Sequence, residues 1–360
     1  MDFGLNMLRQ SPLDVTLVVS PLSVIFALAL VHAGAKGDTK SQINQVISNG
    51  ATDDEIVEFY SGLAKSTLTP KNGVQARIAN AFFMDKRFSI EKQYADIINE
   101  KYSAKVEALD FGQTKQTAET IGEFVSKTTE GKIKHFIKED LVSGALSLIV
   151  NAIYFKSKWE HEFSKESTTN KTLHSSANSK KEIEFLNAPN VIHNYAEDKD
   201  MQVLSLLYKD TSYAFNIILP KKRFGLDKLR KSINGAIIQK LLSQLQPTVL
   251  TISFPKMNIE TDFKLKEALI AMGVTKIFSD SAELTGIAKP KHPPLFVSDA
   301  AHKAIIGVDE SGTVAAAVTV FKVAATAAVG PPISKRFVAD HPFIFVLTKN
   351  NNPLFMGQFA

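Results

Sequence analysis

The segment from Glu310 to Thr326 restricts most strongly what this chain can fold into. It reads Glu-Ser-Gly-Thr-Val-Ala-Ala-Ala-Val-Thr-Val-Phe-Lys-Val-Ala-Ala-Thr, a run of small and β-branched residues that is almost free of charge. Val and Thr favour extended backbone, and alternate residues of a strand point to the same face. One alternate set has only small, uncharged side chains, which can enter a packed interior without burying a charge: Thr313, Ala315, Ala317 and Thr319. Because Gly312 permits a bend just before it, the segment is predicted to be a strand that can lie outside a sheet or fit inside one.

The residues after this segment help to decide between that interpretation and two simpler ones. Taken alone, residues 310–326 fit an ordinary buried strand or a flexible Ala-rich linker better. Gly330-Pro331-Pro332 then prevents regular strand pairing directly downstream. An aromatic and aliphatic run, typical of a core strand, follows at 337–347.

These motifs, in this order and spacing, resemble those of the serpin family. Glu310 followed by Gly312, Thr313 and an Ala-rich run matches the serpin hinge, and Phe337-Val-Ala-Asp-His-Pro-Phe343 matches the family's signature after its reactive loop. The resemblance covers nearly the whole chain, with further matches in the expected order at Ser20-Pro21-Leu-Ser23, Glu130-Gly-Lys-Ile133, Asn151–Trp159, Leu219-Pro-Lys221, Phe254-Pro-Lys256 and Pro353-Leu-Phe-Met-Gly357. It implies an α+β serpin fold with three β-sheets, about nine helices and an exposed C-terminal reactive loop at about 310–336.

Local patterns agree with a mixed fold in one domain, 1–360. Ser20 is expected to cap a helix with Pro21 in its first turn, and Gly34 to end it. Further helices are predicted at 39–47, 54–65, 91–102, 115–128, 226–245 and 263–272. Strands are predicted at 75–84, 146–155, 249–254 and 302–308, with a hairpin at 203–207 and 213–219.

Composition narrows the class of protein and of partner. The chain has 360 residues, no cysteine and a formal net charge of +5. Disulfides and thiolate metal sites are therefore excluded, which fits a reducing compartment. The absence of a signal peptide favours a cytoplasmic protein over an extracellular one.

The densest basic groups include Lys180-Lys181 and Lys221-Lys222-Arg223. We interpret them as solvated loop charges rather than as a polyanion-binding patch, and we expect no nucleic-acid or membrane partner.

No pattern of residues supports catalysis. The chain has no Gly-x-Ser-x-Gly elbow, no Gly-x-Gly-x-x-Gly and no P-loop. His161-Glu162 is not followed by a second His at the spacing of zinc proteases, and the eight histidines form no metal-ligand pattern. We therefore expect neither an enzyme nor a cofactor or metal site, although a Ser-His-Asp group assembled only by the fold stays open at this point.

Four polar or aromatic positions gain a role from the resemblance. Ser23, Asn151 and His302 match the serpin cluster beneath the centre of the main sheet, where strands part to admit the loop. Asn and His can each bond in two directions, so a buried network among them would hold neighbouring strands together. Trp159 matches the Trp at the top of the opening sheet. From the residues alone, three separately satisfied polar groups and one core aromatic would be the simpler interpretation.

The resemblance implies a suicide-substrate inhibitor of proteases. A protease cleaves the loop, is trapped covalently, and is disabled when the freed segment inserts into the main sheet. The expected hinge residues are Glu310, Gly312, Thr313, Ala315, Ala316, Ala317 and Thr319. Val314 differs from the residue that is usual at its position in the family, and Val318 is bulkier than the usual residue. Both lie on the opposite alternate set, so we expect them to slow insertion rather than block it.

The spacing from Glu310 that is usual in the family predicts scission between Thr326 and Ala327. The small residues around this bond favour an elastase-like serine protease as the target, with a papain-like cysteine protease, which would read Ala325, as a second candidate. We expect a monomer that is capable of loop-sheet polymers. The alternative is a non-inhibitory serpin that acts as a carrier, chaperone or storage protein; such members usually carry Pro or charged residues in the hinge, and this hinge carries neither.

Overall fold

The fold is given by a computed structural model that describes residues 1–69, 73–102, 104–289, 292–313 and 334–360. Within these ranges the chain forms ten α-helices and two short 3-10 helices. The helices are α1 (Asp2–Arg9), α2 (Pro21–Gly34), α3 (Gly37–Ser48), α4 (Asp53–Leu68), α5 (Lys92–Tyr102), α6 (Thr114–Thr128), α7 (Glu139–Val142), α8 (Leu226–Ser232), α9 (Gly235–Ser243), α10 (Leu265–Ala271), η1 (Lys165–Ser167) and η2 (Lys276–Phe278).

A six-stranded sheet runs through one half of the molecule and carries the hinge. Its hydrogen-bonded order is β10-β11-β4-β2-β3, and the short β12 also pairs with β4. These strands are β2 (Gln75–Asp85), β3 (Lys105–Leu109), β4 (Ser147–Lys158), β10 (Met257–Lys264), β11 (Asp299–Val308) and β12 (Gly312–Thr313). β11 runs parallel to β4, whereas β12 runs antiparallel to it.

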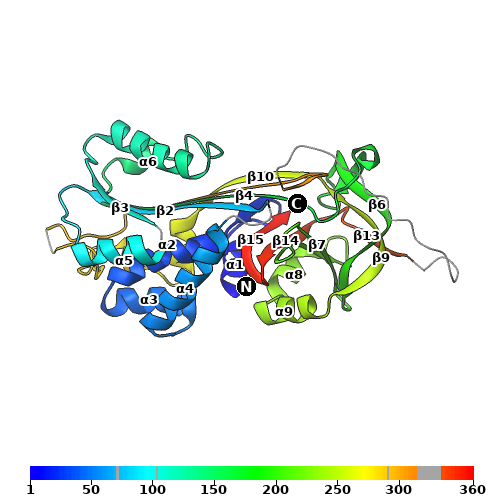
Figure 1. Ribbon diagram of the computed structural model, residues 1–360, viewed down its shortest axis with the longest axis horizontal. Helices are drawn as coiled ribbons and strands as arrows, with labels where there is room; N and C mark the ends of the chain where they lie inside the picture. Colours follow the sequence, from blue (N-terminus) through cyan, green and yellow to red (C-terminus); the bar gives the residue numbers. More distant parts are fainter. Residues whose placement is uncertain (70–72, 103, 290–291, 314–333) are drawn as a thin grey trace.

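Both faces of this sheet are covered, which explains why β2 and β4 read as nearly continuous apolar runs. In β2, Ala79, Ala81 and Phe83 pack with apolar residues of α6, while Ile78, Phe82 and Met84 pack into the larger core on the other side. Figure 1 shows α6 on one face of the sheet and α2 with α5 on the other. α2 is buried on nearly all sides, so the apolar run 22–31 is a core helix.

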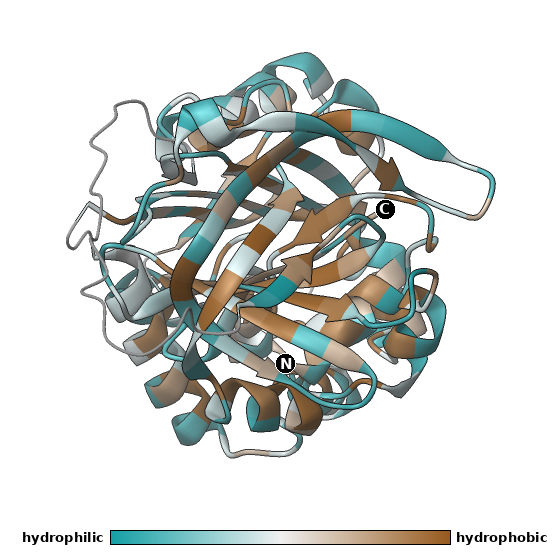
Figure 2. Cartoon of the chain, turned by 90° about the vertical axis from the view of Figure 1, so that its right-hand side faces the viewer, coloured by the Kyte–Doolittle hydropathy of each residue, from teal (hydrophilic) through white to brown (hydrophobic). Residues whose placement is uncertain are grey.

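The second sheet has nine strands in the order β1-β15-β14-β8-β7-β6-β9-β13, with β5 paired to β6. Its strands are β1 (Leu17–Val19), β5 (Thr169–His174), β6 (Lys180–Glu197), β7 (Met201–Leu207), β8 (Tyr213–Pro220), β9 (Gln246–Pro255), β13 (Lys335–Val338), β14 (Phe343–Lys349) and β15 (Asn352–Phe359). The long β6 pairs with β5 and β9 as well as β7, so two groups of strands join into one hydrogen-bonded path where the resemblance implies separate sheets. Seen from the side, the central strands of this half are largely hydrophobic and the outer hairpin hydrophilic (Figure 2).

Most predicted elements are confirmed within a few residues. Ser20 caps α2 as expected, because its hydroxyl accepts a hydrogen bond from Ser23 N, and the helix ends at Gly34. Two predictions were wrong in detail. The helical stretch 226–245 is broken after Ser232, where Asn234 caps a new helix by accepting a bond from Ile237 N. Phe263 belongs to β10, and α10 begins only at Leu265.

Candidate functional site

The hinge begins with a tight turn at the end of β11. Asp309 Oδ1 accepts hydrogen bonds from the backbone N–H groups of Ser311 (2.8 Å) and Gly312 (3.0 Å). Asp309 N donates to Gly312 O at 2.8 Å, which closes the turn. A short Asp side chain that satisfies its own following amides is a common way to stabilise such a reversal. The chain therefore leaves β11 and immediately turns back beside it.

Gly312 is required by the geometry of this turn. Its φ of +147° lies where L side chains are rare, and a Cβ added there would lie 2.2 Å from the carbonyl oxygen of Ser157. Gly312 and Thr313 then pair with Lys158 and Ser157 as β12, a two-residue strand antiparallel to β4. The chain bends at Gly312, as predicted, and Thr313 is already paired in the sheet.

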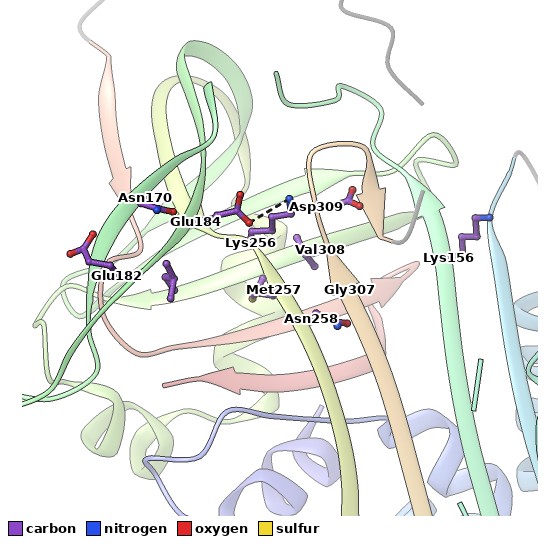
Figure 3. A pocket seen from close by; sticks show the side chains of 11 residues that line it. Lys156, Asn170, Glu182, Glu184, Lys256, Met257, Asn258, Gly307, Val308 and Asp309 are labelled. Atoms are coloured by element: carbon purple, nitrogen blue, oxygen red, sulfur yellow. Dashed lines mark ion pairs between the residues drawn. The ribbon is translucent and has the colours of Figure 1, made fainter. Parts of the chain in front are cut away.

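β12 enters a fork between β11 and β4. The ladder that joins these two strands ends at the pair Ile305 and Tyr154, although β11 continues to Val308 and β4 to Lys158. An open hollow of about 850 Å³ lies beside the mouth of the fork. Figure 3 shows Lys156 of β4 across from Gly307, Val308 and Asp309 of β11 and the turn that follows it. The parallel ladder below Ile305 is intact.

Trp159 and Tyr208 hold the hinge from the side of β4. The Trp159 indole N–H donates to Asp309 O at 2.9 Å, and Trp159 N donates to Ser311 O at 3.0 Å. The Trp159 and Tyr208 rings stack with centroids 4.5 Å apart. The Tyr208 hydroxyl lies 2.7 Å from the Thr313 hydroxyl, and both residues are fully buried. This burial raises the pKa of Tyr208, so its hydroxyl stays protonated.

Glu310 anchors the hinge to residues next to the start of β5 and the end of β9. Its Oε1 accepts from the Thr168 hydroxyl at 2.8 Å and from Lys256 Nζ at 3.2 Å, and Phe163 N donates to its carbonyl at 2.8 Å. The side chain is only 8% exposed. Burial by itself raises the pKa of Glu310, but the hydrogen bonds and the Lys256 charge outweigh it and lower that pKa. Glu310 is therefore held as a carboxylate.

Ser23, Asn151 and His302 meet in a buried network, as predicted. Asn151 Oδ1 accepts from the Ser23 hydroxyl (2.8 Å) and contacts His302 Nδ1. Asn151 Nδ2 donates to Ser23 O at 3.0 Å and to the side-chain oxygen of Asn80. The strand register explains the meeting, because Asn151 of β4 pairs with His302 of β11 on one side and with Asn80 of β2 on the other.

The bonds of His302 define which nitrogen carries its proton. Ser20 N donates to His302 Nε2 at 3.0 Å, so Nε2 is the acceptor and Nδ1–H donates to Asn151 Oδ1. Complete burial lowers the pKa of His302 to about 3. The ring is therefore neutral, and it ties β11 to both β4 and the first turn of α2.

The structure divides the predicted site residues into two places. Trp159 lies with the hinge, just beyond the end of β4, whereas Asn151 and the rest of the network lie near the middle of that strand. Ala315, Ala316, Ala317 and Thr319 of the hinge, and the predicted scissile bond Thr326–Ala327, lie outside the described residues. Sequence reasoning missed Asn80 and Tyr208. A polar amide within the apolar run 78–84 was a signal for Asn80, whereas Tyr208 had none.

Other kinds of site find no support in the part of the chain that the structure describes. No group of three or more His, Asp or Glu side chains there is placed to hold a metal ion. None of the described helices combines the length and the apolar character needed to cross a membrane.

Comparisons with known proteins match the whole chain. A family model described as Serpin (serine protease inhibitor) matches residues 1–360. Iripin-8 of Ixodes ricinus is 31% identical over 368 residues, which cover 99% of this chain and 90% of the relative. Serine protease inhibitor 42Dd of Drosophila melanogaster is 31% identical over 356 residues, which cover 98% of this chain and 93% of the relative.

Solved structures agree with these matches. Serpin48 of the insect Tenebrio molitor superimposes with a TM-score of 0.88 at 28% identity, covering 99% of this chain and 94% of that one. Uncleaved ovalbumin superimposes with a TM-score of 0.88 at 25% identity, covering 99% and 97%. With the hinge turn, the buried network and the family match over its full length, the chain belongs to the serpin family, whose members are in general protease inhibitors.

Proposed function

We propose that this chain inhibits a protease as a suicide substrate. The protease attacks the loop, and the new C-terminal residue of the hinge segment stays bound to the protease nucleophile as an acyl-enzyme. The freed segment 312–325 then inserts between β11 and β4 and carries the tethered protease across the molecule, where its active site is distorted before deacylation. The target is an elastase-like serine protease or, as a second candidate, a papain-like cysteine protease.

The observation that carries this proposal is the docking of Gly312 and Thr313 in the fork between β11 and β4. A strand that continues from Thr313 along β4 is antiparallel to β4 and, because β11 and β4 are parallel, antiparallel to β11 as well. Insertion then exchanges one parallel ladder for two antiparallel ladders. At about 0.5–1.5 kcal/mol net for each additional hydrogen bond, a long strand releases on the order of 10 kcal/mol.

The contacts around the fork also support a barrier to premature insertion. The His302–Asn151 contact crosses from β11 to β4, so parting these strands breaks it. Opening also removes the backbone ladder from Asp299 to Ile305 before new bonds form. A protein held above a more stable form by such contacts is kinetically rather than thermodynamically stable.

The proposed targets follow from the residues around the predicted bond. Ala324, Ala325, Thr326 and Ala327 are small, which suits a small apolar primary pocket, and no Lys or Arg stands at the predicted position. A trypsin-like target is therefore disfavoured. A papain-like protease reads the residue before the scissile one, which is Ala325 here.

Incubation with a panel of proteases tests the proposal. The panel contains an elastase, a chymotrypsin, a trypsin and a papain-like cathepsin, and each mixture is analysed by denaturing electrophoresis, residual activity and mass of the released peptide. We expect an SDS-stable band of the combined mass with the elastase, and a C-terminal peptide that begins at Ala327. A papain-like target is identified by loss of activity, with or without a stable band.

The same experiment distinguishes protease inhibition from the alternative, non-inhibitory function. Clean cleavage in every mixture, with each protease fully active, would indicate a non-inhibitory serpin that acts as a carrier, chaperone or storage protein. The melting temperature of the cleaved chain then shows whether the loop has inserted, because insertion raises it.

A further inference from the structure

Two histidines from distant segments face each other beside the hinge. His161 lies two residues after Trp159, and His193 lies in β6. Their ring centres are 6.3 Å apart, and the ring planes meet at 64°. His161 is exposed and His193 is half-buried. Neither ring has a hydrogen bond or an ion pair to another residue within the described ranges of the chain. The nitrogen atoms of this pair are therefore available to a ligand.

Strand β6 turns the imidazole of His193 inward, although the residue before it is apolar. His193 belongs to the same alternate set as Tyr195, which is 4% exposed, whereas Ile192 belongs to the other set and is 64% exposed. Placing a polar ring inward without a hydrogen bond costs free energy, and so does leaving a large apolar side chain in water. Packing alone would favour the reverse arrangement, so the inward imidazole needs another explanation.

The segment that carries His161 is held against the hinge on both sides of this residue. Before it, Trp159 N donates to Ser311 O at 3.0 Å. After it, Phe163 N donates to Glu310 O at 2.8 Å. His161 thus stands in the middle of a short segment, 159–163, that contacts two successive residues of the hinge. An ion that ties His161 to β6 would hold this segment in place.

The spacing of the two rings fits a shared transition-metal ion. Neutral imidazole is a preferred ligand of Zn²⁺, Cu²⁺ and Ni²⁺. Zinc–nitrogen bonds of about 2.0–2.1 Å place the ring centres of two histidines on one tetrahedral ion roughly 5.2 Å apart. The observed 6.3 Å is longer by about 1 Å, a distance that the exposed side chain of His161 can close by rotation. Mg²⁺ and Ca²⁺ prefer oxygen ligands, so they fit the pair poorly.

We propose that His161 and His193 bind one divalent transition-metal ion, Zn²⁺ or Cu²⁺, in an open site. The two imidazoles supply two ligands, and water completes the coordination. No third His, Asp or Glu of the described residues joins them, so the site differs from the closed cage of a structural zinc centre. The bound ion links β6 to the segment that contacts the hinge. It stabilises the native chain, because the two imidazoles are brought together only in the folded state.

The proposal is independent of protease inhibition, and it is tested with the full chain alone. The chain has no cysteine, so thiolates cannot compete for the ion, and its single Trp lies two residues from His161. The probes are zinc chloride, followed by titration calorimetry and melting temperature, and copper(II) chloride, followed by quenching of Trp159 fluorescence. The variants are His161→Gln, His193→Gln and the double change. The matched control His135→Gln/His292→Gln removes two exposed histidines elsewhere.

We expect the unmodified chain and the control to bind one Zn²⁺ each, to melt at a higher temperature as Zn²⁺ is added, and to show Cu²⁺ quenching that Zn²⁺ reverses. Each single variant should bind at least roughly tenfold more weakly, since the loss of a residue that merely orients a ligand already costs roughly 10–100-fold. The double variant should lose about as much as either single variant, because both histidines hold the same ion. His161→Gln changes an exposed side chain, so it keeps the test decisive if His193→Gln does not fold.

Any of four results would overturn the proposal. The first is an unmodified chain that binds neither ion. The second is equal affinity in the unmodified chain and in both single variants, which would place the ion elsewhere. The third is a double variant whose loss equals the sum of the single losses, which would assign the two histidines to separate sites. The fourth is an equal rise of the melting temperature with magnesium chloride, which would show a general effect of divalent charge instead of coordination by imidazole.

Discussion

The hydroxyl groups of Tyr208, the residue after β7, and Thr313 of the hinge lie 2.7 Å apart in a fully buried contact. Thr313 is the first member of the alternate set of small residues, and it is already paired with Ser157 of β4. The contact therefore fixes the point from which an inserting strand would grow. In the same place, Trp159 stacks on Tyr208 and donates to the hinge turn.

Replacing Tyr208 by Phe is expected to destabilise the native protein by about 1–3 kcal/mol, because the change leaves the buried Thr313 hydroxyl without its partner. The measurement is the first unfolding transition in guanidinium chloride, followed by Trp159 fluorescence, since this single Trp lies against Tyr208.

Tyr102→Phe is the matched control for that change. The Tyr102 hydroxyl is buried and has no hydrogen-bond partner among the described residues, so its removal should be neutral or slightly stabilising. Equal effects of the two substitutions would show that the Tyr208–Thr313 contact contributes nothing specific to the hinge.

His302 is expected to make stability depend on pH. Its pKa is about 3 in the folded chain, whereas the ordinary value is 6.5, so between these values the unfolded chain binds the additional proton. The contribution of His302 is complete above pH 6.5 and is lost as the pH falls, by at most roughly 1.4 kcal/mol for each pH unit. Denaturant unfolding between pH 4 and 7.5 measures this slope.

Two variants identify His302 as the source of that slope. His302→Gln removes the titrating ring and should reduce the slope, leaving the part that comes from His193 and His32, whose pKa values burial also lowers. His135→Gln changes an exposed histidine and should leave the slope unchanged. An identical slope in His302→Gln would assign the pH dependence to other groups.

Much of the fold could be predicted from local patterns, because α2 and α4 begin with side-chain caps and the inner strands are continuous apolar runs. Ser20, Pro21 and Gly34 marked α2 correctly. The strand β2 was predicted to within a residue, since its side chains are buried on both faces of the sheet. The prediction failed at Asn234, whose capping bond starts a new helix inside what reads as one apolar period.

The site was less predictable, because its partners come from distant segments. Asn80 meets Asn151 through the register between β2 and β4, and nothing near residue 80 specifies that register. Tyr208 lies just after β7 and comes beside Thr313 through its bridge with Trp159.

Glu310 is expected to anchor the hinge less firmly in acid. Its pKa is lowered in the folded chain from the ordinary value of 4.5, so the anchoring is complete above pH 4.5 and is lost as the pH falls through the lower folded value. Glu310→Gln keeps an acceptor for Thr168 but removes the charge facing Lys256. We therefore expect the variant to melt at a lower temperature than the unmodified chain at pH 7, and the difference in melting temperature to close below pH 4.5.

Glu58→Gln, an exposed change on α4, is the control and should show no such difference. A difference that stays constant at all pH values for Glu310→Gln would contradict the role of its charge.

Thr313→Arg tests the proposed inhibition most directly. Thr313 is fully buried against Tyr208, and a charged side chain there would have to be desolvated for β12 to stay in the fork. Insertion should become slower than deacylation, so elastase should cleave the variant as a substrate and be released in active form. If the activation free energy of insertion rises by about 1.4 kcal/mol or more, the yield of SDS-stable complex should fall at least roughly tenfold. Val314→Arg, on the opposite alternate set, adds the same charge and should retain most of the complex. If Thr313→Arg forms as much complex as the unmodified chain, burial of this alternate set is not what drives trapping.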